Sequence, residues 1–379
     1  MELEKADVLI VGGGIMGSSL AYHLAKEKKS VILLEKSHVG AEASGRNGGG
    51  VRQQSRDPAE LPLAMKSVEM WSGLSEELSY DVEYKRAGNL IVARTPQQLE
   101  AFESRVKRER KAGLDVRMVT PDEACRLLPS LNKEDIIGGT YCPTDGTANP
   151  IRTTFAFARA AKAAGAKIYT CTEIIGMELA GNVINVVETT RGKMWGEVVV
   201  NAAGPWAPVI GRMIGVDIPI QPKRCQIMVT QQLPDGACTP FSEVSGGYGW
   251  WTQTLHGNVL LGHNSRPVDQ YDYGVTFEAI AFQTHQTVKF LPSFGKVPVI
   301  RCYSGITAWT PDAIPIISYL TEVKGFLIDA GYSGHGFCLG PVSGKLVSEL
   351  ILKGKPSLPL DSFDYYRFHK GSIKEAISH

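Results

Sequence analysis

The sequence predicts an α/β protein of two domains, in which a discontinuous domain built on a parallel sheet carries an inserted domain built on an antiparallel sheet. Three observations predict this arrangement. The chain opens with a strand, a glycine-rich turn and a helix, the same order recurs near its C-terminal end, and short strands separated by turns lie between them. A length of 379 residues also favours two domains over one core.

The N-terminal segment has the order and spacing of a strand–helix–strand unit that binds a dinucleotide. Residues 8–11 predict a buried strand, residues 18–28 a helix and residues 31–34 a second strand. A glycine motif alone is weak evidence, because glycine turns are common. Its position between these elements makes a dinucleotide site in a Rossmann-like domain the favoured interpretation.

Each glycine of the motif has its own physical role. Gly12 lets the chain turn out of the strand, Gly14 lets backbone N–H groups approach a pyrophosphate, and Gly17 lets the helix pack closely on the sheet. The helix directs its positive N-terminal end at the phosphates. Glu35, 18 residues beyond Gly17, can accept hydrogen bonds from a ribose. These features alone suit NAD and FAD equally.

Residues 40–50 contain five glycines among eleven residues, which predicts a backbone pressed against something flat or bulky. A flexible loop is the alternative interpretation. Arg52 and Arg56 follow, and a helix with an apolar face is expected over residues 61–78.

The remaining chain alternates predicted strands and helices. Strands are expected at residues 88–93, 136–141, 166–170, 183–189, 224–230, 248–254 and 259–262, in the β-branched run that begins at residue 197, and from residue 326. Helices are expected at 96–112, from 120, at 153–164, at 277–290 and up to 352. The basic run of the helix at 96–112 is expected to be a solvated face.

The composition indicates a globular protein whose partner is a small molecule or another protein. A formal net charge of +1 disfavours nucleic acid and anionic membranes, which usually need a basic excess. No stretch approaches the length of a membrane span, and the apolar run at 8–11 is too short for a signal peptide. The seven cysteines show no CxxC pair, which predicts reduced thiols in a cytoplasmic protein without a metal site.

Five stretches together carry a more specific signal than the glycine motif. They are Val8 to Glu35, Ser44 to Arg52, Val198 to Pro205, Thr310 to Ile317 and Gly331 to Phe337. In order and spacing they resemble the D-amino-acid oxidase (DAO) family of flavoproteins, which includes glycine oxidase and sarcosine oxidases. Shorter segments are most similar to the FAD-bearing beta subunits of heteromeric proline dehydrogenases and of sarcosine oxidase; these are Gly50 to Gln54, Pro143 to Gly146, Thr252 to Gly257 and Tyr366 to Phe368.

The resemblance implies a discontinuous Rossmann-like FAD-binding domain at residues 1–84, 143–216 and 307–379, with an inserted antiparallel-sheet substrate domain at 85–142 and 217–306. It also implies oxidation of the C–N bond of a secondary or cyclic amino acid (proline, hydroxyproline, sarcosine or opine type) to an imine, by hydride transfer to flavin N5. The chain would then be the catalytic beta subunit of a complex whose partner subunits accept the electrons.

The same resemblance assigns residues to the cofactor. The set is Gly12, Gly14, Ile15, Met16, Gly17, Glu35, Lys36, Ser44, Gly45, Arg46, Asn47, Gly48, Gly49, Ile174, Ala202, Ala203, Gly204, Gly331, Gly334, His335, Gly336 and Phe337. His335 is expected to contact the flavin rather than to act as an acid or base, and N–H groups at the start of the following helix can stabilise negative charge.

Departures from the family pattern bear on the substrate. The stretch before Thr310 lacks the arginine that grips a carboxylate in D-amino-acid and glycine oxidases. Monomeric sarcosine oxidase instead uses an arginine that matches Arg52 and a lysine that matches Cys338. Arg52 is therefore expected to be the carboxylate clamp for a small carboxylated amine, with a structural or phosphate-facing role as the alternative.

Three further positions concern flavin attachment and electron transfer. The cysteine that tethers flavin in monomeric sarcosine oxidases corresponds to Gly305, so FAD is expected to be non-covalent. The lysine that promotes oxygen reactivity falls near Leu260 in a loose alignment, which favours a dehydrogenase. The histidine that anchors FMN in sarcosine oxidase beta subunits appears as Pro150, so FMN at a subunit interface would be unattached.

Aromatic and histidine side chains of the inserted sheet are the remaining candidates. Tyr248, Trp250 and Trp251 could shape an apolar pocket for a ring or N-alkyl group, with Tyr248 and Trp251 ranked beside Arg52 and His335 as catalytic-site residues; a core role is the alternative. Structural roles are favoured for His256 and His263. No strong general base is needed if desolvation lowers the pKa of the substrate amine.

Other functions stay open at this point. One is a non-catalytic FAD-binding subunit that relays electrons, and another is a stand-alone glycine or D-amino-acid oxidase. A flavin reductase that uses NAD(P)H and a redox-active disulfide is disfavoured, because the sequence has neither a close cysteine pair nor a second nucleotide motif.

Overall fold

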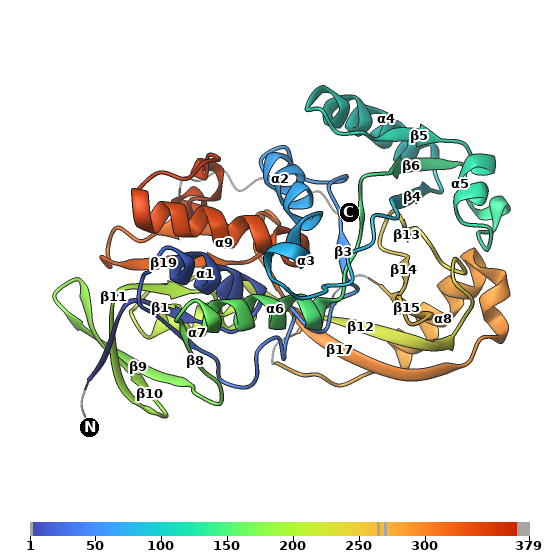
Figure 1. Ribbon diagram of the computed structural model, residues 1–379. Helices are drawn as coiled ribbons and strands as arrows, with labels where there is room; N and C mark the ends of the chain where they lie inside the picture. The colour runs from blue at the N-terminus through green and yellow to red at the C-terminus, as the bar shows by residue number, and fades with distance from the viewer. Residues whose placement is uncertain (1–2, 264–265, 269–270, 370–379) are drawn as a thin grey trace.

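The computed structural model describes residues 3–263, 266–268 and 271–369 (Figure 1). Two large sheets lie side by side, and the long strands β12 (Gln221–Gln232) and β17 (Val299–Trp309) run antiparallel along the second of them. The first sheet takes its strands from the two ends and the middle of the chain, and the second takes them from the segments between.

The first sheet has the order β18-β19-β11-β1-β2-β8, and β18 is its one antiparallel strand on this path. A hairpin of β9 and β10 extends from β11. The strand bounds are β1 Glu4–Val11, β2 Val31–Leu34, β8 Lys167–Tyr169, β9 Ile174–Ala180, β10 Val183–Thr189, β11 Gly192–Asn201, β18 Ile316–Tyr319 and β19 Phe326–Ala330.

Helices cover one face of this sheet, and the β9–β10 hairpin lies toward the other (Figure 1). Alternation along β1 explains the layers, because Val8 and Ile10 pack with the helices whereas Leu9 and Val11 pack on the opposite side. The helices on the first face are α1 Ile15–Lys26, α2 Leu61–Trp71, α3 Leu74–Glu77, α6 Pro150–Ala163 and α9 Gly336–Lys353, while α7 Ala207–Arg212 lies on the second.

The second sheet has the order β16-β12-β15-β14-β13-β4-β6-β5, with β17 beside β12. Its pairs are antiparallel except for β13 with β4. The bounds are β4 Asn89–Ala93, β5 Arg117–Val119, β6 Gly138–Cys142, β13 Phe241–Val244, β14 Gly249–Gln253, β15 Asn258–Gly262 and β16 Arg266–Pro267; the helices are α4 Pro96–Lys111, α5 Pro121–Leu127 and α8 Phe277–Phe290. Two short strands, β3 Gly50–Val51 and β7 Gly146–Thr147, pair between the sheets.

Most expected elements are present, but the structure also contains elements that the sequence did not predict. Strands β5, β9, β13, β17 and β18, the two-residue strands β3, β7 and β16, and helix α7 have no counterpart among the expected elements. The helix expected over 61–78 is interrupted at residues 72–73. Gly73 accounts for the interruption because glycine is a poor helix former. Arg105 is also not on a solvated face: its guanidinium donates to Ser55 Oγ and Thr140 Oγ1, and the side chain is 14% exposed.

The division of strands between the sheets follows the expected segments, although β17 continues to Trp309, past the expected boundary at residue 306. Where each domain ends stays a prediction, and residues 370–379 of the expected FAD domain lie outside the described part of the chain. Within the described part, no helix is both long and apolar enough to span a bilayer.

Candidate active site

A cavity of about 1190 Å³ lies between the two sheets. It is larger than the cavities of about 300–1,000 Å³ that suit drug-sized ligands. The N-terminal ends of α1 and α9 both border it, through Ile15 and Gly336 respectively. Two helix ends therefore direct positive potential at one cavity.

The turn between β1 and α1 forms one wall of the cavity. Gly12 has φ +111°, and a Cβ there would lie 2.5 Å from the carbonyl oxygen of Ala202. A Cβ on Gly17 would lie 2.0 Å from the carbonyl oxygen of Gly12, so glycine is required for the close packing of α1 on β1. The turn therefore brings bare backbone to the cavity.

The acidic residue at the end of β2 supports the turn. Glu35 is 8% exposed, and its carboxylate accepts from the N–H groups of Gly13 (2.7 Å) and Ser37 (2.7 Å). It lines the cavity, so its remaining lone pairs can still accept from a ribose. Beside it, the ammonium of Lys36 lies 3.3 Å from the ring centroid of Trp206, and burial lowers the pKa of Lys36.

The loop at residues 44–49 is fixed by its own hydrogen bonds. Ser44 Oγ accepts from the Ile15 N–H at the start of α1 (2.9 Å). Asn47 accepts from the Gly49 N–H and donates to the carbonyls of Ala43 and Ser44. The loop is therefore a rigid wall rather than a flexible segment.

Arg46 ties this loop to the second sheet. Its guanidinium donates to the carbonyls of Ala41 (2.8 Å) and Ser304 (3.1 Å), and Ser304 belongs to β17. Tyr273 stacks under the same guanidinium and donates to Glu42 (2.6 Å). The second sheet therefore helps to hold the loop in place.

The glycines of the loop are pressed against protein. A Cβ on Gly45 would lie 2.2 Å from the carbonyl oxygen of Gly40, and one on Gly49 would lie 2.3 Å from that of Ala148. A Cβ on Gly48 would lie 2.5 Å from the Trp250 indole. The sequence predicted that this glycine-rich segment lies against something flat or bulky. In the structure, the neighbours are backbone carbonyls and the Trp250 indole.

The part of the cavity wall that β13 and β14 of the second sheet provide is aromatic and charged. Trp250 stacks on Phe241, with centroids 5.7 Å apart and planes 17° apart. The guanidinium of Arg52 lies over Phe241 at 4.8 Å, and its Nη1 is 2.6 Å from Oε2 of Glu243. All four residues line the cavity, which makes this part of it suited to a small molecule with both apolar and charged parts.

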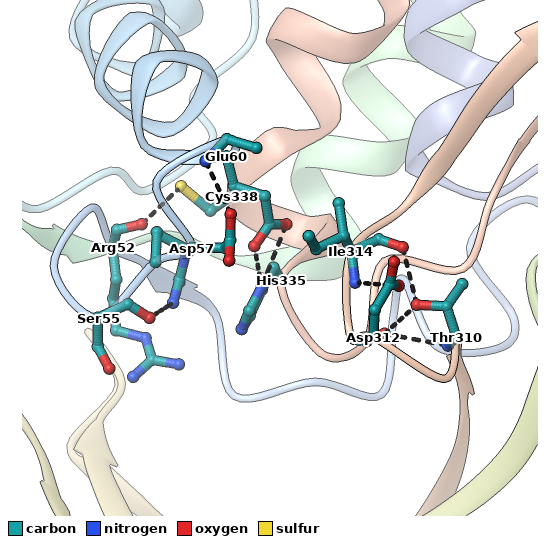
Figure 2. A network of polar contacts seen from close by, with 12 residues as sticks. Arg52, Ser55, Asp57, Glu60, Thr310, Asp312, Ile314, His335 and Cys338 are labelled. Atoms are coloured by element: carbon teal, nitrogen blue, oxygen red, sulfur yellow. Dashed lines mark hydrogen bonds and ion pairs between the residues drawn. The ribbon is translucent and has the colours of Figure 1, made fainter. Parts of the chain in front are cut away.

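A second charged cluster lies beside Arg52. The carboxylate of Glu60 is 1% exposed and points at the ring of His335, with Oε2 and Nδ1 3.0 Å apart (Figure 2). Figure 2 also shows the thiol of Cys338 directed at the backbone carbonyl of Arg52, to which it donates (3.3 Å). Arg56 lines the cavity, and its buried Nε has no hydrogen-bond partner among the described residues.

Most residues predicted for the site border the cavity. Those that line it are Gly12, Gly14, Ile15, Met16, Glu35, Lys36, Ser44, Arg46, Asn47, Gly48, Arg52, Ile174, Ala202, Ala203, Gly204, Gly331, Gly334, His335, Gly336 and Phe337. Gly17, Gly45 and Gly49 lie behind this wall, in close contact with backbone carbonyls.

Tyr248 and Trp251 do not border the cavity, so their expected place beside the substrate needs correction. Trp251 is 1% exposed and donates its indole N–H to Thr287 of α8. Tyr248 packs on the same side, under Arg94 at 4.5 Å. Side chains alternate along β14, so Trp250 faces the cavity and Trp251 faces α8.

The other candidate positions divide in the same way. His263 lines the cavity, whereas His256 has a 70% exposed side chain outside it. Gly305 lines the cavity opposite Cys225, which also borders it. Leu260 does not, but Lys223 does, with its ammonium 4.1 Å from the ring centroid of Trp309. The cavity is therefore lined by a cation that the loose alignment missed, so the position of Leu260 does not by itself favour a dehydrogenase.

Sequence reasoning missed Glu243, Glu60 and the cavity-facing role of Arg56. Glu243 is 191 residues from Arg52, and Glu60 is 275 residues from His335. Each pair is formed by the fold. Only the period-2 alternation of residues 241–243 could have indicated that Phe241 and Glu243 share a face.

The residues present fit a bound dinucleotide. A bare glycine turn, two helix ends and a ribose-facing carboxylate lie along one wall, in the arrangement that binds the ADP part of such cofactors. The cavity then continues to the Arg52 end, which leaves space for a flavin and a small substrate.

Known proteins share both the sequence pattern and this fold. The solved L-proline dehydrogenase of P. horikoshii is 34% identical with a TM-score of 0.94, over 98% of this chain and 100% of that chain. Glycine oxidase of Geobacillus kaustophilus is 29% identical over 378 residues, covering 97% of this chain and 98% of its own. Sarcosine oxidase subunit beta of Rhodobacter capsulatus is 26% identical over 384 residues, covering 99% and 92%.

Some relatives are much longer, and the chain spans 41% of the length of human mitochondrial sarcosine dehydrogenase. The family model described as FAD dependent oxidoreductase matches residues 7–350, which is most of the chain. The chain therefore belongs to the DAO family of FAD-dependent oxidoreductases.

Proposed function

We propose that this protein is an FAD-dependent dehydrogenase that oxidises the C–N bond of a secondary or cyclic amino acid to an imine. Proline, hydroxyproline, sarcosine and opine types are the substrate candidates. The observation that carries the proposal is the Arg52 guanidinium beside the aromatic pair of Phe241 and Trp250 at one end of the cavity. The similarity to a proline dehydrogenase, a glycine oxidase and a sarcosine oxidase subunit supports this substrate class.

The residues at this end supply binding and orientation. Arg52 can hold a carboxylate through two parallel hydrogen bonds, because its guanidinium is planar. Trp250 and Phe241 offer apolar surface to a ring or N-alkyl group and keep water from it. Bound FAD would supply the acceptor for the hydride that leaves the substrate carbon, while the amine gives up a proton as the C=N bond forms.

Desolvation favours this chemistry because the substrate amine must be neutral when it is oxidised. A partly buried aromatic wall disfavours a charged amine and lowers its pKa. The start of α9 adds positive potential to the cavity wall at Gly336, where negative charge can be stabilised.

FAD is proposed to be held without a covalent bond. Gly305 offers no side chain, and Cys225, the cysteine present among the cavity-lining residues, donates its thiol to the carbonyl of His263 (3.3 Å). Denaturation should therefore release all the flavin into the supernatant. A flavin–peptide adduct in the mass spectrum of a digest would contradict this part of the proposal.

The chain is proposed to work as the catalytic subunit of a complex, which the similarity to a sarcosine oxidase beta subunit supports. The first turns of α6 expose Ile151 and Phe155, with 63% and 50% of their surface accessible. Ile151 lies beside Gly45 of the cavity loop, so a partner seated there would be close to the cofactor. FMN bound at such an interface would be unattached, because Pro150 has no nucleophile.

The test is anaerobic reduction of the bound flavin by a panel of amino acids. Reduction is detected as a loss of the visible absorbance of the flavin. We expect at least one secondary or cyclic amino acid to bleach the flavin. If none does so while the purified complex still turns over, the chain is an electron-relay subunit. Turnover should also be much faster with an artificial acceptor than with oxygen, and rapid peroxide formation would make the protein an oxidase.

A further inference from the structure

Glu243 occupies a position from which it can contact a substrate directly. It lies on β13 opposite Trp250 of β14, and it shares the cavity-facing side of β13 with Phe241. Its side chain is 24% exposed, in a cavity wall that is otherwise aromatic at this point. A carboxylate in such a place needs a partner of opposite charge.

Arg52 is that partner in the structure without substrate. The two groups are 2.6 Å apart, and the Arg52 side chain is 16% exposed. Burial raises the pKa of Glu243, but Arg52, Arg56 and Arg105 outweigh it and hold that pKa below the usual value. Glu243 is therefore an anion, and Arg52 and Glu243 present a cation and an anion in direct contact, with Arg56 also among the cavity-lining residues.

A free amino acid carries the same two charges, at a similar separation. Its carboxylate can replace the Glu243 carboxylate on Arg52, but this alone would leave the largely shielded Glu243 carboxylate without its ion-pair partner. Its ammonium group can supply that partner on binding, and Glu243 can then accept the ammonium proton, which leaves the neutral amine that oxidation requires. We infer that Glu243 determines specificity by binding the substrate's ammonium group while Arg52 binds the carboxylate, an inference that rests on the proposed function.

This arrangement selects against molecules with one charge. A monocarboxylate must displace the Glu243 carboxylate from Arg52, and it has no cationic group to pair with that carboxylate. A simple amine leaves Arg52 unpaired in the same way. A zwitterion satisfies both groups, so it exchanges one ion pair for two.

The test compares each amino acid with its oxygen isostere, which keeps the carboxylate and lacks the ammonium. The probes are tetrahydro-2-furoate for proline and methoxyacetate for sarcosine. Binding is followed by perturbation of the oxidised flavin spectrum, and turnover by flavin reduction. Glu243→Gln is the variant, Glu243→Asp tests rescue by the charge, and Glu178→Gln is a control that removes one acid from an exposed ion pair with Lys193.

In Glu243→Gln we expect the amino acid to bind at least about tenfold more weakly, because it loses a hydrogen bond between two charged groups. The isostere should bind as well as before or more tightly, because Arg52 is released from its internal partner. Glu243→Asp should recover part of the preference for the amino acid, and Glu178→Gln should match the wild type.

Equal weakening of both probes would mean that Glu243 only positions Arg52, and would overturn the inference. No change in either would overturn it too. Failure of the proposed function is distinguishable, since no amino acid would then reduce the wild-type flavin, although the spectral titrations would still compare the two kinds of ligand.

Discussion

Nδ1 of His335 lies 3.0 Å from the carboxylate of Glu60, inside a wall of the cavity (Figure 2). Burial lowers the pKa of His335, and the charge of Arg56 lowers it further against the opposing effect of Glu60. The ring is therefore neutral at pH 7. Because a carboxylate only accepts, Nδ1 carries the proton and Nε2 is an acceptor.

Replacing Glu60 by glutamine should reverse the polarity of the His335 ring. The amide can donate to Nδ1, which moves the proton to Nε2. We expect a shifted visible spectrum of the bound flavin and a rate of flavin reduction lowered roughly tenfold, about the effect of one hydrogen bond. Glu76→Gln, an exposed change in α3, is the control. An unchanged spectrum and rate would show that the Glu60 contact is only structural.

Arg52→Lys should separate charge from geometry at the carboxylate clamp. Lysine keeps the charge but loses the planar pair of donors, so KM for the amino acid that reduces the flavin should rise at least about tenfold. FAD content should not change, because the Arg52 side chain contacts Glu243 and Phe241 of the second sheet rather than the glycine turn. Arg159→Lys, whose guanidinium donates to the Ser79 carbonyl on the surface, is the control. Unchanged kinetics would rule out the clamp.

Arg52→Ala should abolish turnover for carboxylated substrates, but it also leaves Glu243 without its partner. The double variant Arg52→Ala with Glu243→Gln removes that unpaired charge. Thermal unfolding should show recovered stability in the double variant, and steady-state assays should show no recovered activity. Recovery of both would indicate that Arg52 matters only for stability.

Gly17→Ala should prevent FAD binding. A Cβ at this position would lie 2.0 Å from the Gly12 carbonyl oxygen, so α1 must move away from the turn. The ratio of flavin to protein absorbance should fall to a small fraction of the wild-type value. Gly73→Ala is a matched control, because a Cβ there meets nothing within 4 Å. Normal flavin content in Gly17→Ala would argue against the cofactor position.

Two adjacent tryptophans should give opposite phenotypes. Trp251→Ala removes a core side chain and should cost about 3–5 kcal/mol of unfolding free energy, with little change in KM. Trp250→Ala removes the cavity wall and should raise KM for the substrate at a smaller cost in stability. Urea unfolding and steady-state kinetics of both variants measure this. The reverse pattern would mean that Trp251, rather than Trp250, faces the substrate.

His23 should make the fold sensitive to acid. Burial lowers its pKa from 6.5 to about 4, and its Nε2 has no hydrogen-bond partner among the described residues. As the pH falls, His23 binds a proton in the unfolded chain before it does so in the folded protein. The stability that the neutral His23 contributes is therefore fully present above pH 6.5 and is lost as the pH falls toward 4. The free energy of unfolding of the wild type, relative to that of His23→Met, should therefore fall by at most about 3 kcal/mol between pH 6.5 and pH 4.

The comparison with His23→Met is necessary because other buried groups change the free energy of unfolding in the opposite direction over the same pH range. Burial raises the pKa of Asp145 and of Asp329 to about 6, so their contribution is lost as the pH rises from 3.8 toward 6. Urea unfolding at several pH values gives the difference. A difference that stays constant from pH 6.5 to 4 would mean that His23 is protonated in the folded protein.

The nucleotide half of the site was open to prediction because its signals are local. Gly12 to Glu35 is one continuous segment, and Gly17 is required by the carbonyl of Gly12 within it, although the neighbour that requires Gly12 is the distant Ala202. The bounds of α8, Phe277–Phe290, also follow from local periodicity.

The substrate half of the site could not be predicted in the same way, because its signals are not local. β17 has exposed residues at its start and pairs with β12, far away in the chain, so its local pattern is weak. Glu243 and Glu60 acquire their roles only through contacts across 191 and 275 residues. The error at Trp251 came from the phase of a strand, which one residue reverses.

The contact of Gly48 with the Trp250 indole limits how this enzyme could acquire new substrates. Enlarging or turning the side chain at position 250 disturbs the loop that borders the cofactor, so most such changes would lose flavin before they gained a new reaction. Gly262 confines the other edge of the same indole. Divergence within the family would then be expected at Glu243 and Ile227, which border the cavity.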